Sequence, residues 1–181
     1  MPTPHNKSQW HQGYLRSAYL PQNRGFNTTF GYYEGAIDYY AHTSSAGLDL
    51  HSATAGGEQS CEPTYNGTYD MVLFAERAID VLKAHDESSA PFFMYLALHS
   101  VHEPDECPAN WTAAYAKVTD TDHRKTMCGM VSAMDYEIGR VVDAWKAKSD
   151  AFWANSVVLY HADNGGPVYA GAGTINYPLR G

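Results

Sequence analysis

Apolar positions divide the second half of this chain into two helices and two strands. Helical spacing of apolar residues predicts a helix near residues 70–85, with Asp70 as its N-cap, and a longer helix over roughly residues 122–148. The runs at 92–98 and within 156–161 are instead continuously apolar, which is typical of strands buried on both faces of a sheet. The order strand, long helix, strand predicts a βαβ unit and therefore a parallel pair in an α/β fold.

The first half of the chain shows no comparable periodicity. Residues 1–40 are rich in aromatic residues and glycine, and we expect ordered loops with short turns there. Residues 41–68 are rich in Ser, Thr, Gly and Ala and predict a long exposed connection. Two strands are too few for a complete doubly wound sheet, so we expect this chain to be one slice of a larger domain.

Charge and hydropathy exclude two classes of partner. Twelve Lys and Arg residues stand against 20 Asp and Glu residues, which gives a formal net charge of −8 and no basic footprint for nucleic acid. No apolar run approaches the roughly 18 residues that a membrane span needs. A site for an anionic substrate would therefore have to be built locally.

Glycosylation sequons and cysteines favour the secretory pathway and a longer protein. Residues 1–13 contain no apolar signal-peptide core. Four N-x-S/T sequons nevertheless favour a secretory protein, with candidate acceptors at Asn6, Asn27, Asn66 and Asn110. The cysteines are odd in number, so one is free or has a partner outside this chain, and their pairing stays open: Cys61, Cys107 and Cys128.

Two polar clusters follow the two predicted strands. Asp163 and Asn164 follow the second strand, and their oxygens are hard ligands suited to Ca²⁺ or Mg²⁺, although with the two glycines that follow they are also a good turn sequence. His99 and His102 follow the first strand, where an imidazole could donate to an anion or protonate a leaving group. A structural role is an equal alternative for His99. Because parallel strands end at one edge of a sheet, we expect the two clusters to lie together.

Two further polar groups are weak signals by themselves. The segment W-H-Q-G at 10–13 presents His11, which a surface histidine would also explain. Arg180 is a lone cation after a Gly-rich stretch, and such a residue is more often on the surface than in a site. Together with the two clusters at the strand ends, however, these two groups make four polar clusters, which are more informative as a set than singly.

The four clusters together resemble the sulfatases, most of all the arylsulfatase B-like group that removes sulfate from N-acetylgalactosamine residues. The matching segments follow family order over nearly the whole chain: W-H-Q-G at 10–13, L-P-Q-N-R-G-F at 20–26, F-G-Y-Y at 30–33, D-Y-Y at 38–40, L-A-L-H-S-V-H-E-P at 96–104, G-M-V-S-A-M-D at 129–135, A-D-N-G-G at 162–166 and N-Y-P-L-R-G at 176–181. The resemblance implies an alkaline phosphatase-like α/β fold, with a mostly parallel sheet flanked by helices, and sulfate ester hydrolysis with a calcium ion.

The resemblance also assigns roles to individual residues. Asp163 and Asn164 match two metal ligands of the family, and His11 matches the histidine near the nucleophile. His102 matches the histidine that contacts the sulfate and the leaving oxygen, and Arg180 is expected to bind substrate. The implied substrate is a sulfated glycan or an aryl sulfate ester.

Several family features are missing from residues 1–181. The nucleophile is a formylglycine made from a C/S-x-P-x-R motif by a formylglycine-generating enzyme, and this motif is absent; the segment that begins at Cys61 has Tyr65 in place of the arginine. The paired aspartates are also absent, and Gln9 replaces the lysine that usually precedes W-H. We therefore expect part of one catalytic domain, without its N-terminal nucleophile and Asp-Asp segment and without its C-terminal continuation, that is inactive alone.

Two other functions fit the same residues less closely. One is a phosphatase or phosphodiesterase of the same fold, because a fold alone does not determine function. The other is a non-catalytic module that binds calcium or sulfated glycans after loss of the nucleophile. For the full-length sulfatase we expect a lysosomal or extracellular location.

Overall fold

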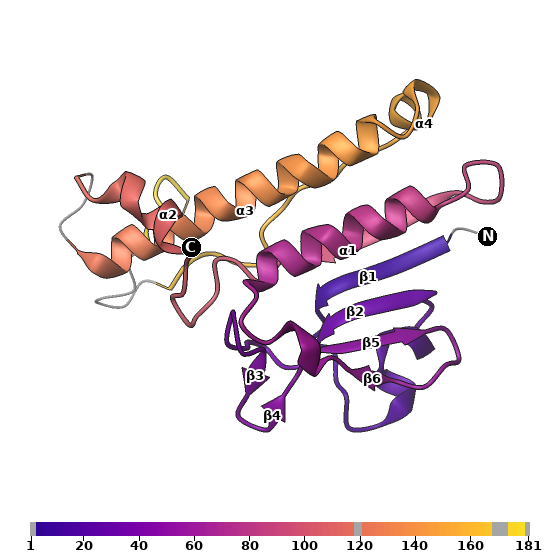
Figure 1. Cartoon of the computed structure of the whole chain (residues 1–181), viewed down its shortest axis with the longest axis horizontal. Helices are drawn as coiled ribbons and strands as arrows, with labels where there is room; N and C mark the ends of the chain where they lie inside the picture. The colour runs from indigo at the N-terminus through magenta and orange to yellow at the C-terminus, as the bar shows by residue number, and fades with distance from the viewer. Residues whose placement is uncertain (1–2, 118–120, 168–173, 180–181) are drawn as a thin grey trace.

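A five-stranded sheet and two long helices make up most of the protein (Figure 1). The computed structural model describes residues 3–117, 121–167 and 174–179. The strands of the sheet lie in the order β6-β5-β2-β1-β7, and a separate short hairpin joins β3 and β4. The elements are β1 Thr3–Gln9, β2 Thr28–Tyr32, β3 Thr43–Ser44, β4 Gly47–Leu48, β5 His51–Thr54, β6 Ser60–Cys61, α1 Asp70–Ala84, β7 Phe92–Ala97, α2 Ala109–Thr112, α3 Asp122–Lys146 and α4 Asp150–Ala154.

The centre of the sheet is parallel. Strand β1 pairs in parallel with β2 on one side and with β7 on the other. Strand β5 is antiparallel to β2, and β6 is antiparallel to β5. The carboxyl ends of β1, β2 and β7 therefore meet at one edge, and the loops that leave these strands lie there together.

The core lies between the sheet and α1, and between α1 and α3. One buried cluster joins β2 and α1 to the segments before β3 and after β4 through Phe30, Tyr32, Ile37, Leu50, Leu73 and Phe74. A second joins the start of α1 to α3 through Tyr39, Tyr69, Met71, Met127, Met130 and Ala133. Both helices bury one stripe, which is the reason their apolar residues recur at helical spacing. Figure 1 shows α3 lying along α1 on the same side of the sheet.

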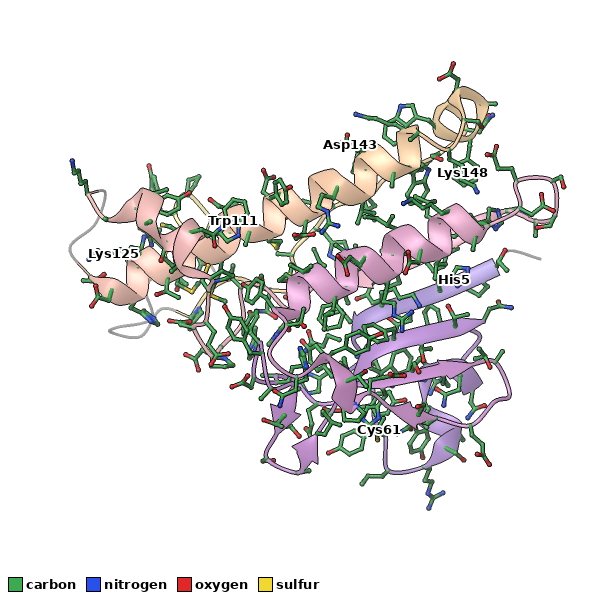
Figure 2. The ribbon with its side chains drawn as sticks, in the orientation of Figure 1. His5, Cys61, Trp111, Lys125, Asp143 and Lys148 are labelled. Carbon is green, nitrogen blue, oxygen red and sulfur yellow. The ribbon has the colours of Figure 1, made fainter. Side chains whose placement is uncertain are left out.

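Both predicted helices are confirmed. Their ends are joined by Lys148, which donates from Nζ to the carbonyl oxygens of Lys83, at 3.2 Å, and His85 (Figure 2). A cation at these carbonyls also compensates the negative end of the α1 dipole. Asp70 is not the N-cap of α1: it is the first helical residue, its carboxylate points into the core, and Tyr69 occupies the N-cap position. None of the helices in the described ranges has the length and hydropathy that crossing a membrane requires.

The expected loops with short turns are found over residues 10–27, but the first half of the chain also contains strands. Residues 1–40 contain β1 and β2, and residues 41–68 contain four short strands, two of which extend the sheet. Strand β1 was missed because its buried residues are polar, among them His5, Asn6 and Lys7. Two of these side chains share a partner on β2: His5 Nδ1 lies 2.7 Å and Lys7 Nζ 3.2 Å from Oγ1 of Thr28.

The predicted buried strand at 156–161 is also wrong. Within the described ranges the segment pairs with no strand, and Val157 and Leu159 are 91% and 82% exposed. Strand β7 is consequently an edge strand, and Phe93 and Tyr95 on its outer face are 50% and 43% exposed. The described helices that contact β7 pack on its opposite face. A further strand placed beside β7 would therefore be covered on one face only.

The close approach of β1 and β2 yields a stability test. Gly31 pairs with Ser8, and a Cβ at Gly31 would lie 1.9 Å from the Ser8 carbonyl oxygen. Gly31→Ala should therefore separate the two strands and lower the free energy of unfolding by roughly 1–3 kcal/mol or more. Gly139→Ala on α3 is the control, because a Cβ there meets no atom within 4 Å. It should raise stability by about 1 kcal/mol, and urea unfolding of both variants measures the difference; equal midpoints would contradict the prediction.

Candidate active site

The loop after β1 presents His11 at the carboxyl edge of the sheet. Trp10 and His11 donate their backbone N–H groups to the carbonyl oxygens of Tyr32, at 2.9 Å, and Tyr33, at 3.2 Å, so this loop is tied to the end of β2. The His11 side chain is exposed. A Cβ at Gly35 would lie only 2.8 Å from the His11 ring, which makes the absence of a side chain at Gly35 necessary for this placement.

His102 lies on the loop after β7, also with an exposed side chain. Its backbone N–H donates to the His99 carbonyl at 3.0 Å, and its own carbonyl accepts from the Tyr39 hydroxyl at 2.9 Å. Its ring Nδ1 lies 2.9 Å from the Glu103 carbonyl, to which it can only donate. Nε2 is thus the nitrogen left to give or take a proton.

A buried pair lies behind His102. His99 Nδ1 donates to Asp70 Oδ2 at 2.7 Å, and both side chains are 0% exposed. The Tyr39 ring stacks on the His99 ring, with 3.9 Å between centroids. Burial raises the pKa of Asp70 to about 6, and the hydrogen bond from His99 opposes this rise. His99 therefore has the buried role that the sequence left open for it.

The Asp163-Asn164 segment is a bend that is held by hydrogen bonds between adjacent residues. The Asn164 N–H donates to Asp163 Oδ1 at 2.8 Å, and the Asn164 side chain donates to the Gly165 carbonyl at 3.0 Å. The pKa of Tyr32, at the end of β2, is raised well above its usual value, mainly by burial. The charge of Asp163 is the smallest of the contributions to this shift.

The described residues do not form a calcium site by themselves. Asp163 and Asn164 have suitable oxygens, but calcium takes six to eight ligands. Among the described residues, no group of three or more His, Cys, Asp and Glu side chains is placed to hold a metal ion.

Other predicted residues have mixed outcomes. Arg180 lies outside the described residues. Asn6 is only 2% exposed in β1, so its assignment as an accessible glycan acceptor is corrected: a glycan there would displace the centre of the sheet. The remaining acceptors are exposed, namely Asn27, Asn66 and Asn110. The three cysteines are unpaired in the structure.

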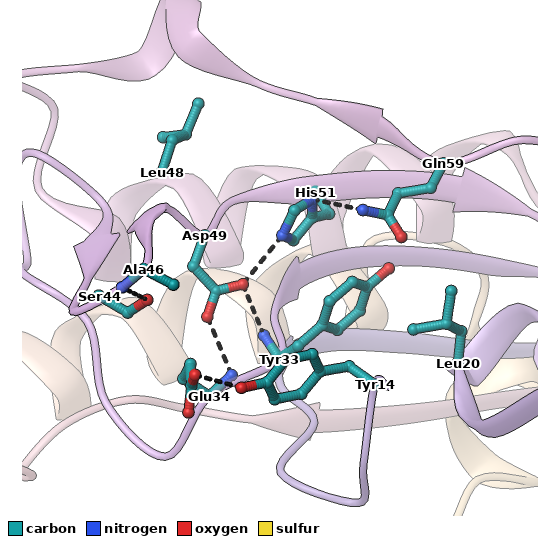
Figure 3. Close-up of a pocket in the computed structure, with 10 residues that line it drawn as sticks. All are labelled: Tyr14, Leu20, Tyr33, Glu34, Ser44, Ala46, Leu48, Asp49, His51 and Gln59. Atoms are coloured by element: carbon teal, nitrogen blue, oxygen red, sulfur yellow. Dashed lines mark hydrogen bonds and ion pairs between the residues drawn. The ribbon is translucent and has the colours of Figure 1, made fainter. Parts of the chain in front are cut away.

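A second polar network, which the sequence did not reveal, holds the loop behind His11 (Figure 3). Asp49 accepts from the N–H groups of Tyr33 at 3.0 Å and Glu34 at 2.9 Å, and from His51 Nε2 at 2.9 Å. Gln59 lies 2.9 Å from the other ring nitrogen of His51. These residues line a pocket of about 190 Å³. The L-D-L-H segment carries no motif that would have distinguished Asp49 and His51 from surface residues.

The sulfatase family model matches residues 6–180. The chain belongs to the sulfatase family. It is 32% identical to arylsulfatase J of Mus musculus over 182 residues, which cover 98% of this chain and 29% of the mouse protein. This sulfatase chain thus spans under a third of the length of that relative.

Solved structures show the fold of the sulfatase chain. Ps i-CgsB matches 99% of the chain, and 40% of its own, with a TM-score of 0.80 at 23% identity. The structure of Ps i-CgsB in complex with k-i-k-neocarrahexaose matches 81% of the chain, and 34% of its own, with a TM-score of 0.68 at 21% identity. The predicted alkaline phosphatase-like fold, with a mostly parallel sheet flanked by helices, is confirmed.

The raised pKa of Asp70 predicts a pH dependence of stability. A folded-state pKa of about 6, against 3.8 for an aspartate in the unfolded chain, means that the folded chain binds the Asp70 proton more tightly than the unfolded chain. Stability from this group is full below about pH 4 and is lost as the pH rises through 6. Asp70→Asn should remove this loss, so the wild type should become less stable relative to the variant between pH 4 and pH 7.

The comparison of wild type and variant cancels the titrating groups that do not contact Asp70. Urea unfolding at several pH values measures it, and exposed Asp80 on α1 supplies the control. Asp80→Asn should show no comparable pH dependence of the difference. A pH-independent difference for Asp70→Asn would show that Asp70 ionises normally in the fold.

Proposed function

We propose that the complete protein that contains this chain hydrolyses sulfate esters of a glycan or an aryl alcohol. Membership of the sulfatase family supports the reaction class. The observation that carries the proposal is the pair of exposed histidines, His11 and His102, on loops from the parallel strands β1 and β7 at one sheet edge. An anionic ester could reach both rings there, even though the chain has a net charge of −8.

His102 would act as the general acid. As the S–O bond to the alcohol breaks, the leaving oxygen gains negative charge and needs a proton. The hydrogen bond from Nδ1 to the Glu103 carbonyl leaves Nε2 of the protonated ring to supply it. His11 would contact the reacting group from the loop after β1, and Arg180 would bind the substrate anion.

The metal requirement is proposed on the donor chemistry alone. Asp163 and Asn164 would provide part of the ligand set for one calcium ion, with the other ligands outside this chain. When bound, such an ion polarises sulfate oxygens. The formylglycine nucleophile, and the enzyme that generates it, are likewise proposed for the complete protein.

The substrate and the location are proposed more broadly. The complex of Ps i-CgsB with k-i-k-neocarrahexaose supports a sulfated glycan as the substrate. The likeness to arylsulfatase J and the exposed acceptors Asn27, Asn66 and Asn110 support a lysosomal or extracellular location.

Activity assays of the complete protein test the proposal. We expect hydrolysis of a chromogenic aryl sulfate or a sulfated oligosaccharide, and kcat should fall by roughly 100-fold or more in His102→Ala because a general acid contributes about 10²–10⁴. His85→Gln, at the end of α1, is the matched control and should leave kcat within about twofold of wild type.

Parallel assays with phosphate esters separate the phosphatase alternative. Turnover of phosphate but not sulfate esters would contradict the proposal, as would sulfatase activity that survives His102→Ala. Binding of a sulfated glycan without any turnover would instead support a non-catalytic module.

A further inference from the structure

We infer that the buried Asp70–His99 pair is a positioning device for His102. The inference rests on the proposed function, because it concerns the residue proposed there as the general acid. In this view neither Asp70 nor His99 touches substrate. Both act through the backbone of the loop that carries His102.

The burial of the pair is the first observation. Asp70 Oδ2 and His99 Nδ1 are 2.7 Å apart, with both side chains 0% exposed. Burying two ionisable groups costs desolvation that an apolar pair of the same volume would not, so such a pair is weak evidence of a role in stability. The pair also leaves Asp70 Oδ1 and His99 Nε2 without a hydrogen-bond partner among the described residues. A role in specifying local geometry accounts for it better.

Two hydrogen bonds hold the backbone of His102. The His99 carbonyl accepts the His102 N–H at 3.0 Å, and the Tyr39 hydroxyl donates to the His102 carbonyl at 2.9 Å. Both polar groups of the His102 backbone are thus held, one by His99 and one by Tyr39. The ring of His102 remains exposed and free to meet a ligand.

Asp70 holds both anchors. It accepts from the His99 ring, and its own N–H donates to the Tyr39 carbonyl at 2.9 Å. The Tyr39 and His99 rings then stack at an interplanar angle of 14°. Because Asp70 is the first residue of α1, the whole arrangement is attached to a rigid helix that is packed on the sheet.

Loss of the Asp70 acceptor should therefore displace His102. The His99 ring would be free to turn, the stack with Tyr39 would shift, and both anchors of the His102 backbone would move. A misplacement of about 1 Å at a catalytic group can cost roughly 10²-fold in rate. Substrate binding by other groups would be retained, so the loss should appear in kcat rather than KM.

Steady-state kinetics of the complete protein test the inference. Asp70→Ala should lower kcat by about 10- to 100-fold with KM within about threefold. Asp70→Asn keeps an acceptor for His99 Nδ1 and should restore kcat to within about fivefold of wild type. Leu82→Ala, fully buried in the last turn of α1, controls for lost stability and should leave kcat within about twofold at a temperature where it is folded. Equal kcat losses in Leu82→Ala and Asp70→Ala would overturn the inference.

A second variant covers the case in which Asp70→Ala does not fold. Tyr39→Phe removes only the hydroxyl that donates to the His102 carbonyl and keeps the stack on His99. It should lower kcat several-fold with KM unchanged. Wild-type kcat in Tyr39→Phe would overturn the inference.

Amide hydrogen exchange at His102 gives a readout that needs no activity. Its N–H should exchange at least tenfold faster in Asp70→Ala than in Leu82→Ala, because the N–H donates to the carbonyl of His99. If the wild type lacks sulfatase turnover, the proposed function fails while the exchange rate still decides the inference. Unchanged exchange in Asp70→Ala would overturn it.

Discussion

The central position of β1 is the constraint on which the rest of the structure depends. It pairs in parallel with β2 on one side and with β7 on the other, so three strands end at the same edge. The loops that carry His11 and His102 leave from two of these ends. The placement is costly, because burial lowers the pKa of Lys7 to about 8 and that of His5 to about 4. The Thr28 hydroxyl on β2 offsets part of this cost by bonding to both side chains.

At this edge of the sheet, the side chains that meet solvent are different from the buried side chains that hold them in place. The rings of His11 and His102 are exposed, whereas Asp70, His99 and Tyr39 beneath His102 are buried. Away from water, hydrogen bonds and stacking have fewer competing partners and define a single arrangement more firmly. An exposed imidazole on a firmly held backbone suits a group that must meet a substrate repeatedly in one geometry.

The sequence predicted the helices well and the sheet poorly. Helices α1 and α3 follow from local periodicity, since each buries one stripe. Strand β1 has no such signal, because its buried residues are polar and its partners lie about 20 to 90 residues away. The prediction for segment 156–161 fails in the opposite way. Its apolar run predicts a buried strand, but in the described ranges the segment pairs with no other strand. An apolar run reports that burial is favourable, not that a covering layer is present.

For the site, the sequence by itself determined which side chains are available for chemistry. His11, His102, Asp163 and Asn164 stand in short motifs, and the order of these motifs along the chain is that of the sulfatase family. Only the tertiary structure decided which groups hold those side chains in place. Asp70 and Asp49 carry no motif of their own, because their roles arise from contacts across 16 to 29 residues of chain. Such contacts are set by the parallel pairing of the sheet and the packing of α1 upon it, which local sequence patterns do not encode.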